Sequence, residues 1–277
     1  MRLNKISDRV YANTEKETGG NVGIILLEKC VVAVDSKYPT SGIEFRRSIL
    51  KLTSRPVTHL LLTHYHGDHV FGNQAFEDCE IIAHSLLKKK MEENLKTIWK
   101  PANLKKMIEE IKTSRPQVAP QYEGLKITLP NKTFDRQFVL DGIKMLHVPG
   151  HTADSSIVYI SDDHILFSGD LIFAKSFPWG GDPSANPDSW IKAFKRILKM
   201  NVETIVPGHG QLCDKTEIKA QLDWFEAIRK KMKKLIKDGI SLEEAVKYSK
   251  YPKLYEPESE DWRENTLRHW YEFWKEK

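Results

Sequence analysis

Three histidines and one aspartate lie within six consecutive residues, in the stretch His64-Tyr65-His66-Gly67-Asp68-His69. Neutral imidazole and carboxylate are the protein groups that best suit Zn²⁺ and related divalent ions. The stretch directly follows the apolar run Leu60-Leu61-Leu62, so it leaves a predicted buried strand as a turn. The first two histidines can then face one point beyond the strand, while the last two residues face a neighbouring point. The spacing predicts a metal-binding turn, and a polar loop with incidental histidines is the alternative.

Three further candidate ligands each follow an apolar run and have a glycine beside them. His151 lies in Pro149-Gly150-His151-Thr152, Asp170 in Phe167-Ser168-Gly169-Asp170, and His209 in Val206-Pro207-Gly208-His209-Gly210. Glycine lets the backbone turn tightly and approach a site closely. This placement is typical of a site assembled from several strand ends, so we expect these three residues to lie at such ends.

Short strands and amphipathic helices must position these residues. The pattern predicts strands at Val22 to Leu27, Cys30 to Val34 and Val57 to Leu62, and a helix from Ser41 to Leu52. Together they form a β-α-β unit with candidate ligands at its carboxyl end. The stretch from Thr113 to Gly124 has no clear periodicity, which indicates a connector or a lid.

The second half of the chain again builds sheet and then turns helical. Asp141-Gly142 between two apolar runs predicts a type I′ hairpin. Ser241 followed by Glu244 predicts a capped helix start. Helical patterns cover residues 85–99, 103–111, 187–199, 212–239, 241–248 and 259–276.

Composition limits the class of protein. The 277 residues contain 43 Lys and Arg against 38 Asp and Glu, and the lysines are scattered in short clusters. Such clusters indicate solvated helix surfaces, so nucleic acid is not an expected partner. Three cysteines give no disulfide framework. The charged N-terminal stretch and the lack of a long apolar run predict a cytoplasmic protein without membrane contact.

The ordered motif set resembles that of the metallo-β-lactamase-fold hydrolases, over about Val10 to Gln211. The resemblance implies an α+β fold: a four-layer αβ/βα sandwich in which two mixed sheets lie face to face with helices outside. It also implies two parts, a catalytic domain at residues 1–212 and a C-terminal helical extension at residues 213–277 that packs on it.

The resemblance further implies a site with two divalent metal ions, Zn²⁺ in the first place, with Fe or Mn as alternatives. It assigns His64, His66 and His151 to one ion, Asp68, His69 and His209 to the other, and Asp170 to a bridge between them. A water activated between the ions would then attack a carbonyl or phosphorus centre. Asp68 and Asp170 are the expected catalytic residues, with Asp68 orienting the nucleophile.

The expected reaction is hydrolysis of an ester, lactone, thioester or amide bond in a small molecule, with β-lactams among promiscuous substrates. The aspartate at position 170 resembles the glyoxalase II, lactonase and phosphodiesterase branches, so a dedicated antibiotic-resistance role is disfavoured. Phosphodiester or phosphotriester hydrolysis at the same site is an alternative. A mononuclear iron sulfur dioxygenase with ligands at His64, His151 and Asp170 is another, and a non-catalytic binding module is least favoured because every ligand is retained.

The remaining candidates have structural interpretations beside functional ones. Five histidines outside the motifs are expected to be structural or surface residues: His59, His84, His147, His164 and His269. Among them, His84 is the main candidate for a metal role. Four aromatic residues could wall a substrate pocket or pack in the core: Trp99, Tyr122, Phe177 and Trp179. The C-terminal aromatics predict a helical apolar face that packs on the main domain or forms a homodimer: Trp262, Trp270, Tyr271 and Trp274.

Overall fold

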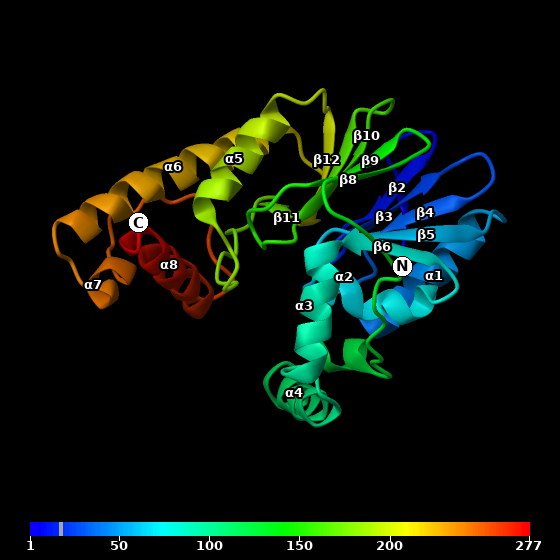
Figure 1. Ribbon diagram of the computed structural model, residues 1–277, viewed down its shortest axis with the longest axis horizontal. Helices are drawn as coiled ribbons and strands as arrows, with labels where there is room; N and C mark the ends of the chain where they lie inside the picture. The colour runs from blue at the N-terminus through cyan, green and yellow to red at the C-terminus, as the bar shows by residue number, and fades with distance from the viewer. Residues whose placement is uncertain (17–18) are drawn as a thin grey trace.

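The computed structural model describes residues 1–16 and 19–277, and its strands form two mixed sheets (Figure 1). The seven-stranded sheet has the order β1 (Asn4–Lys5), β2 (Val10–Asn13), β3 (Val22–Leu26), β4 (Val31–Val34), β5 (Val57–Leu62), β6 (Glu80–His84) and β7 (Lys132–Phe134). The five-stranded sheet has the order β12 (Thr204–His209), β11 (Ile165–Phe173), β10 (Ser156–Ile160), β9 (Ile143–His147) and β8 (Gln137–Leu140). The first sheet is antiparallel up to β4 and parallel beyond it, whereas in the second only β11 and β12 are parallel.

Helices cover the outer faces of the sheets. Their bounds are α1 (Pro39–Leu52), α2 (Gly67–Val70), η2 (Phe71–Phe76), α3 (Ser85–Lys96), α4 (Pro101–Ser114), η3 (Ala119–Tyr122), α5 (Pro187–Leu198), α6 (Lys215–Lys237), α7 (Leu242–Val246) and α8 (Glu260–Lys275). In Figure 1, α3 and α4 extend toward the bottom of the view, and α6 to α8 lie at its left. None of the helices among the described residues combines the length and the apolar character needed to cross a membrane.

The pleat of the strands produces the layers. Side chains alternate between the two faces of a strand, so Val31 and Ala33 of β4 pack toward α1, while Val32 and Val34 face the other sheet. The inter-sheet core also contains Phe167 of β11. The outer face of the second sheet packs against α5, α6 and α8 in one further apolar cluster. The predicted four-layer sandwich is therefore confirmed.

Most predicted elements are present, with shifts at their ends. The Asp141-Gly142 hairpin has positive φ at both residues, 42° and 80°, as a type I′ turn requires. The capping box at Ser241 is also present. The helices α1 and α4 begin two residues earlier than predicted, at Pro39 and Pro101, because proline is well tolerated in the first helical turn. The predicted lid or connector contains η3, and its Tyr122 is buried.

Three of the four C-terminal aromatic residues are buried within their own chain, and Trp262 is half-buried. Trp270, Tyr271 and Trp274 of α8 are each at most 4% exposed. Trp270 packs on Phe225 of α6, with ring centroids 4.7 Å apart, and on Trp190 of α5 at 6.5 Å. Of the two predicted roles for this face, the structure therefore displays packing on the main body of the protein.

Candidate metal centre

The turn after β5 directs its ligand-type side chains to two neighbouring points. His64 and His66 have left the strand, and His66 stands at the start of α2 with extended backbone, φ −64° and ψ 146°. Asp68 and His69 lie in the short helical turn that follows, where the His69 N–H donates to the His66 carbonyl at 2.9 Å. The change from extended to helical backbone separates the two pairs, as the sequence predicts.

The second sheet supplies the other three residues. His151 lies in the loop after β9, and His209 is the last residue of β12. Asp170 was expected at a strand end, but it lies inside β11, so this expectation is wrong. The pairing of β11 with β12 shifts register on either side of Gly169, whose φ is +50°. This irregularity bends the strand and turns Asp170 toward the edge where the two sheets meet.

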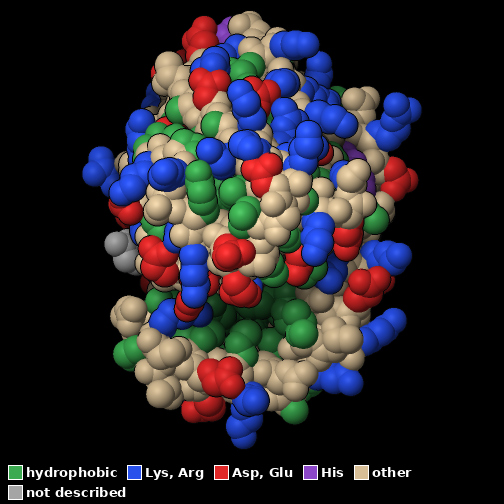
Figure 2. Space-filling model, turned by 90° about the vertical axis from the view of Figure 1, so that its left-hand side faces the viewer, with side chains coloured by type: hydrophobic (Ala, Val, Ile, Leu, Met, Phe, Trp, Pro, Cys, Tyr) green, Lys and Arg blue, Asp and Glu red, His purple; other side chains and the backbone are tan. Residues whose placement is uncertain are grey.

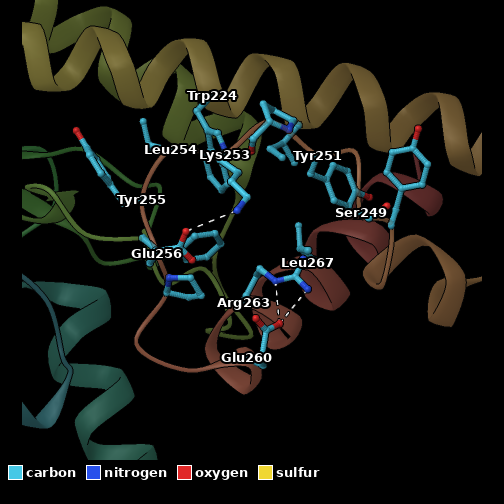
Figure 3. A pocket seen from close by; sticks show the side chains of 15 residues that line it. Trp224, Ser249, Tyr251, Lys253, Leu254, Tyr255, Glu256, Glu260, Arg263 and Leu267 are labelled. Atoms are coloured by element: carbon cyan, nitrogen blue, oxygen red, sulfur yellow. Dashed lines mark hydrogen bonds and ion pairs between the residues drawn. The ribbon is translucent and has the colours of Figure 1, made fainter.

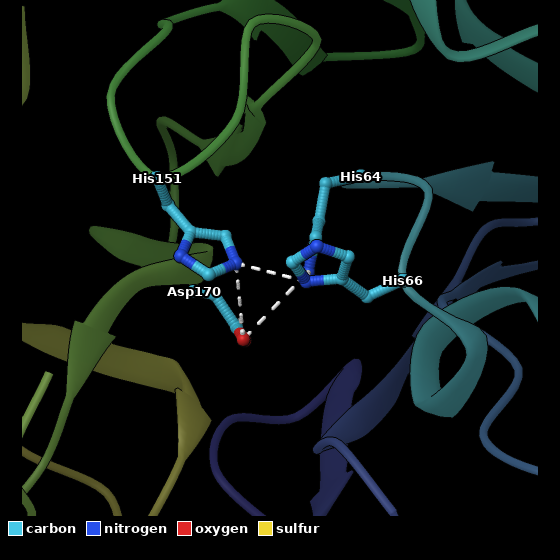
Figure 4. A group of neighbouring side chains, drawn as sticks. All are labelled: His64, His66, His151 and Asp170. Carbon is cyan, nitrogen blue, oxygen red and sulfur yellow. Dashed lines mark hydrogen bonds and ion pairs between the residues drawn. The ribbon is translucent and has the colours of Figure 1, made fainter. Parts of the chain in front are cut away.

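The first group of ligand-type residues is His64, His66, His151 and Asp170 (Figure 4). The His66 Nδ1 atom lies 3.1 Å from His64 Nε2 and 3.0 Å from His151 Nε2. Asp170 Oδ2 lies 3.6 Å from the same His64 atom and 3.5 Å from that of His151. All four ligand-type atoms lie within 4.8 Å of one another. This is the spacing at which one ion can contact them all.

The second group is Asp68, His69 and His209. Asp68 Oδ2 lies 3.2 Å from His209 Nε2 and 3.7 Å from His69 Nε2. Asp170 reaches this group too, because its Oδ1 lies 3.1 Å from His69 Nε2 and its Oδ2 lies 3.4 Å from His209 Nε2. The Asp170 carboxylate therefore stands between the two groups and contacts both.

The outward nitrogens of four histidines are held by oxygen atoms. His64 Nδ1 is paired with Thr63 Oγ1 at 3.1 Å, His66 Nε2 with Asp182 Oδ2 at 3.0 Å, His69 Nδ1 with Asp35 Oδ2 at 2.8 Å, and His151 Nδ1 with the Trp179 carbonyl at 3.0 Å. A neutral imidazole that donates through one nitrogen presents a lone pair at the other. Four lone pairs are thus directed inward, which fits a cation between them.

Two atoms at the centre of the site test this fit independently. His69 Nε2 and Asp170 Oδ1 are buried and face each other at 3.1 Å, but neither atom has a partner with hydrogen-bond geometry among the described residues. Buried polar atoms normally have a partner, and a set of imidazole nitrogens with carboxylate oxygens is the donor set of a divalent transition metal. The residues present therefore fit one or two such ions.

The histidine pKa values shift in opposite directions in the two ligand groups. Burial, followed by neighbouring histidines, lowers the pKa of His64 well below its ordinary value and that of His151 to about 4. Burial opposes charge on His69 and His209 as well, but Asp170 and Asp68 outweigh it; the pKa of His209 rises to about 9 and that of His69 also rises. Without a metal ion, protons thus supply positive charge beside these carboxylates.

Two residues that position the site were not predicted from the sequence. Asp35 follows β4 directly and accepts hydrogen bonds from the backbone N–H and the hydroxyl of Thr63, both at 2.7 Å, besides holding His69. Because β4 and β5 are parallel neighbours, a residue directly after β4 lies beside the turn that follows β5. The position of Asp35 in the sequence could therefore have predicted its contact with the site. Asp182, in the loop between β11 and α5, accepts from His66 and from the Tyr65 hydroxyl. No local pattern marks that residue.

The predicted pocket aromatics have different surroundings. The Trp179 ring lies 5.3 Å from that of His66 and 5.9 Å from that of His151. Phe177 packs on Trp224, and Trp99 packs in the core on Phe71, whereas Tyr122 packs on Tyr38. The five histidines outside the motifs belong to neither ligand group, and His84 stacks on His147 with centroids 3.8 Å apart.

The loop that carries Trp179 is braced by α8. The Gly180 N–H donates to Thr266 Oγ1 at 3.0 Å, and Trp262 Nε1 donates to the Phe177 carbonyl at 3.3 Å. A separate cavity of about 240 Å³ lies behind this loop, between α6, α8 and residues 248–257, and Phe177 forms one of its walls (Figure 3). None of its lining residues belongs to either ligand group. The helices α6 to α8 therefore support the site from outside, through this loop and through Phe173, which contacts Trp262 of α8 and stacks on His209.

Two mixed sheets with a histidine and aspartate cluster at their common edge define a metal-binding αβ/βα sandwich. The sequence profile described as the metallo-beta-lactamase superfamily matches residues 16–209, so the chain belongs to that superfamily, as the motifs indicated. The chain is 25% identical over 74% of its length to a beta-lactamase-like protein 2 homolog of Caenorhabditis elegans, and it spans 60% of that protein. It is also 25% identical to metallo-beta-lactamase type 2 of Bacillus cereus, over 80% of this chain and 82% of that one. The crystal structure of the DIM-1 metallo-beta-lactamase has a similar fold, with a TM-score of 0.63 at 16% identity, over 81% of this chain and 96% of that one.

Proposed function

We propose that the protein is a hydrolase that uses two divalent metal ions, Zn²⁺ in the first place, to cleave an ester, lactone, thioester or amide bond. His64, His66 and His151 would hold one ion, and Asp68, His69 and His209 the other. The observation that carries the proposal is the position of Asp170, whose two oxygens contact histidines of both groups. A carboxylate in this position suits a bridge between two ions.

When bound, two divalent ions lower the pKa of water and polarise the oxygen of the scissile bond. Asp68 is partly exposed, and the neighbouring histidines outweigh burial to hold its pKa well below the ordinary value, so its carboxylate is ionised and can orient a water molecule. Trp179 covers one side of the first group. A thiol nucleophile is not favoured at Cys213, because burial, followed by Glu217, raises its pKa to about 12.

The helical residues 213–277 would form an extension of the catalytic domain at 1–212. Their contacts with the Phe177 to Asp182 loop support a bracing role, since α8 holds this loop at Gly180 while Trp179 faces the ligand residues. This assignment makes the extension a support for the site rather than a source of ligands.

The test combines metal analysis with a substrate panel. Purified protein should contain close to two metal ions per chain, and Asp170→Ala should lose at least one, whereas Asp223→Ala, an exposed aspartate on α6, should lose none. Aryl esters, lactones and a bis-aryl phosphate are then assayed side by side, before and after chelation. Hydrolysis that persists after complete metal removal contradicts the proposal. A faster reaction with the phosphate favours phosphodiester hydrolysis, and iron with oxygen uptake on a persulfide favours a dioxygenase.

A further inference from the structure

A hollow of about 710 Å³ lies against α4 and η3, at the segment that the sequence marks as a connector or a lid. Its apolar lining comes from Ile108, Pro116, Ala119, Pro120, Tyr122 and Leu125. Its size is within the range of sites that bind small molecules. The surface of the protein also has other apolar depressions, and Figure 2 shows one lined by hydrophobic side chains in the lower part of the face that it presents.

Tyr122 connects this hollow to the metal centre. Its ring lies 4.8 Å from that of Tyr38, centroid to centroid. The Tyr38 ring and the Asp68 carbonyl both border Gly19, since each would lie 3.1 Å from a Cβ placed on that residue. Burial, and then the Asp68 carboxylate, raise the pKa of the Tyr122 hydroxyl. The two tyrosines therefore lie between the second ligand group and the hollow.

The wall of the hollow is attached at both ends to elements next to the site. Thr40 of α1 donates through Oγ1 to the Pro120 carbonyl at 2.8 Å. Gln74 of η2 donates to the Gly124 carbonyl at 3.0 Å and accepts from the Lys126 N–H at 2.6 Å. Since η2 directly follows the metal-binding turn, the hollow has a fixed position relative to Asp68 and His69.

The lining favours an uncharged, apolar occupant. Its charged members, Lys112 and Glu123, are both exposed, and Lys112 is paired with Glu109 at 2.8 Å. Ala119 and Leu125 are half-buried and offer only hydrocarbon. A fixed apolar surface beside a hydrolytic centre gains free energy by removing substrate hydrocarbon from water.

We propose that this hollow is the subsite for an apolar acyl chain or aromatic substituent of the substrate, so that the enzyme prefers esters and thioesters of hydrophobic acids. The inference rests on the proposed function for its chemistry, but the subsite itself is a binding surface that can be tested without turnover. Tyr122 forms the junction at which the chain leaves the metal centre.

The experiment compares p-nitrophenyl acetate, butyrate and octanoate with the zinc-loaded protein, each rate being normalised to hydrolysis by hydroxide alone. Each methylene moved from water to an apolar wall contributes up to about fourfold in binding, so kcat/KM should rise roughly tenfold or more from acetate to octanoate. Ala119→Trp fills the hollow and should reduce this ratio at least fivefold. Ala102→Trp, on an exposed position of α4 outside the lining, is the matched control and should keep the ratio.

A second measurement keeps the two proposals separate. Binding of the neutral fluorescent probe N-phenyl-1-naphthylamine, and its displacement by octanol, should be weakened in Ala119→Trp and unchanged in Ala102→Trp. If no ester, lactone, thioester or amide is hydrolysed but the probe behaves in this way, the proposed function fails and the apolar binding surface stands. A flat chain-length profile, or equal effects of the two tryptophans on probe binding, overturns the subsite. Should Ala119→Trp lower the midpoint of thermal unfolding by more than a few degrees, Ala119→Leu replaces it.

Discussion

Asp182→Asn is expected to weaken metal binding by the first ligand group, although Asp182 itself is not in that group. Its Oδ1 accepts from the Ser184 backbone N–H at 2.7 Å and from the Ser184 hydroxyl at 2.6 Å. Its Oδ2 accepts from Tyr65 and from His66 Nε2. The side chain is 2% exposed, so water cannot replace a lost partner.

Asparagine has the same shape but only one oxygen. The backbone N–H of Ser184 cannot turn away, so the amide oxygen of the variant stays on that side and its NH₂ group faces His66. The imidazole then accepts at Nε2 and carries its proton on Nδ1, the atom that faces His64 and His151. Loss of such an outer partner typically lowers metal affinity about 10- to 100-fold, or about 1.4–2.7 kcal/mol.

Competition with a chromophoric zinc chelator measures both dissociation constants directly. Tyr65→Phe is the matched variant, because it removes the other donor to the same oxygen and leaves the hydrogen bond to His66 in place. We expect Tyr65→Phe to change each of the two zinc dissociation constants by less than about threefold. The reasoning is refuted if Asp182→Asn binds zinc as the wild type does, or if Tyr65→Phe loses as much affinity.

Two further predictions concern stability. His209 has a folded-state pKa of about 9 against an ordinary value of 6.5, so in chelated protein its contribution is complete below pH 6.5 and is lost as the pH rises through 9. The unfolding midpoint of chelated protein should therefore fall over this interval, and His209→Ala should flatten the profile; a midpoint that rises with pH contradicts the sign. Gly72→Ala would place its Cβ 1.9 Å from the Ser36 carbonyl and should cost more than about 3 kcal/mol in urea unfolding. Gly124→Ala, at φ +67° with open space around it, should cost only about 1–2 kcal/mol, and equal losses would contradict this account.

The candidate ligands were predictable because local sequence carries their signal. A buried strand followed by a histidine-rich turn places its side chains within a few residues, and the resulting cluster from His64 to His69 needs no knowledge of distant contacts. The later residues, His151 and His209, follow apolar runs that become strands. Asp170 was recognised by the same pattern, although its strand continues past it, because the bulge at Gly169 depends on how β11 pairs with β12.

The residues that hold the ligands were less accessible to sequence reasoning. Asp35 meets Thr63 only because β4 and β5 are adjacent and parallel, which is a property of the sheet order. Asp182 reaches His66 from the opposite half of the chain, through a loop whose path depends on α8. The end of α3 also depends on a tertiary contact. The helix ends at Lys96 instead of the predicted Trp99, because the backbone leaves helical geometry at Thr97 and Trp99 packs on Phe71.

The division of the candidate ligands between the two halves of the chain has a consequence for folding. The turn after β5 belongs to one half of the chain, and His151, Asp170 and His209 belong to the other, so an ion bound to both acts as a reversible cross-link between them. An ion that binds only the native arrangement stabilises it by mass action, by about 4 kcal/mol at a free concentration a thousand times the dissociation constant. Metal binding and docking of the sheets then depend on each other, so a weakened apolar contact between the sheets, such as that of Phe167 in the core between them, would lower the affinity for the ion.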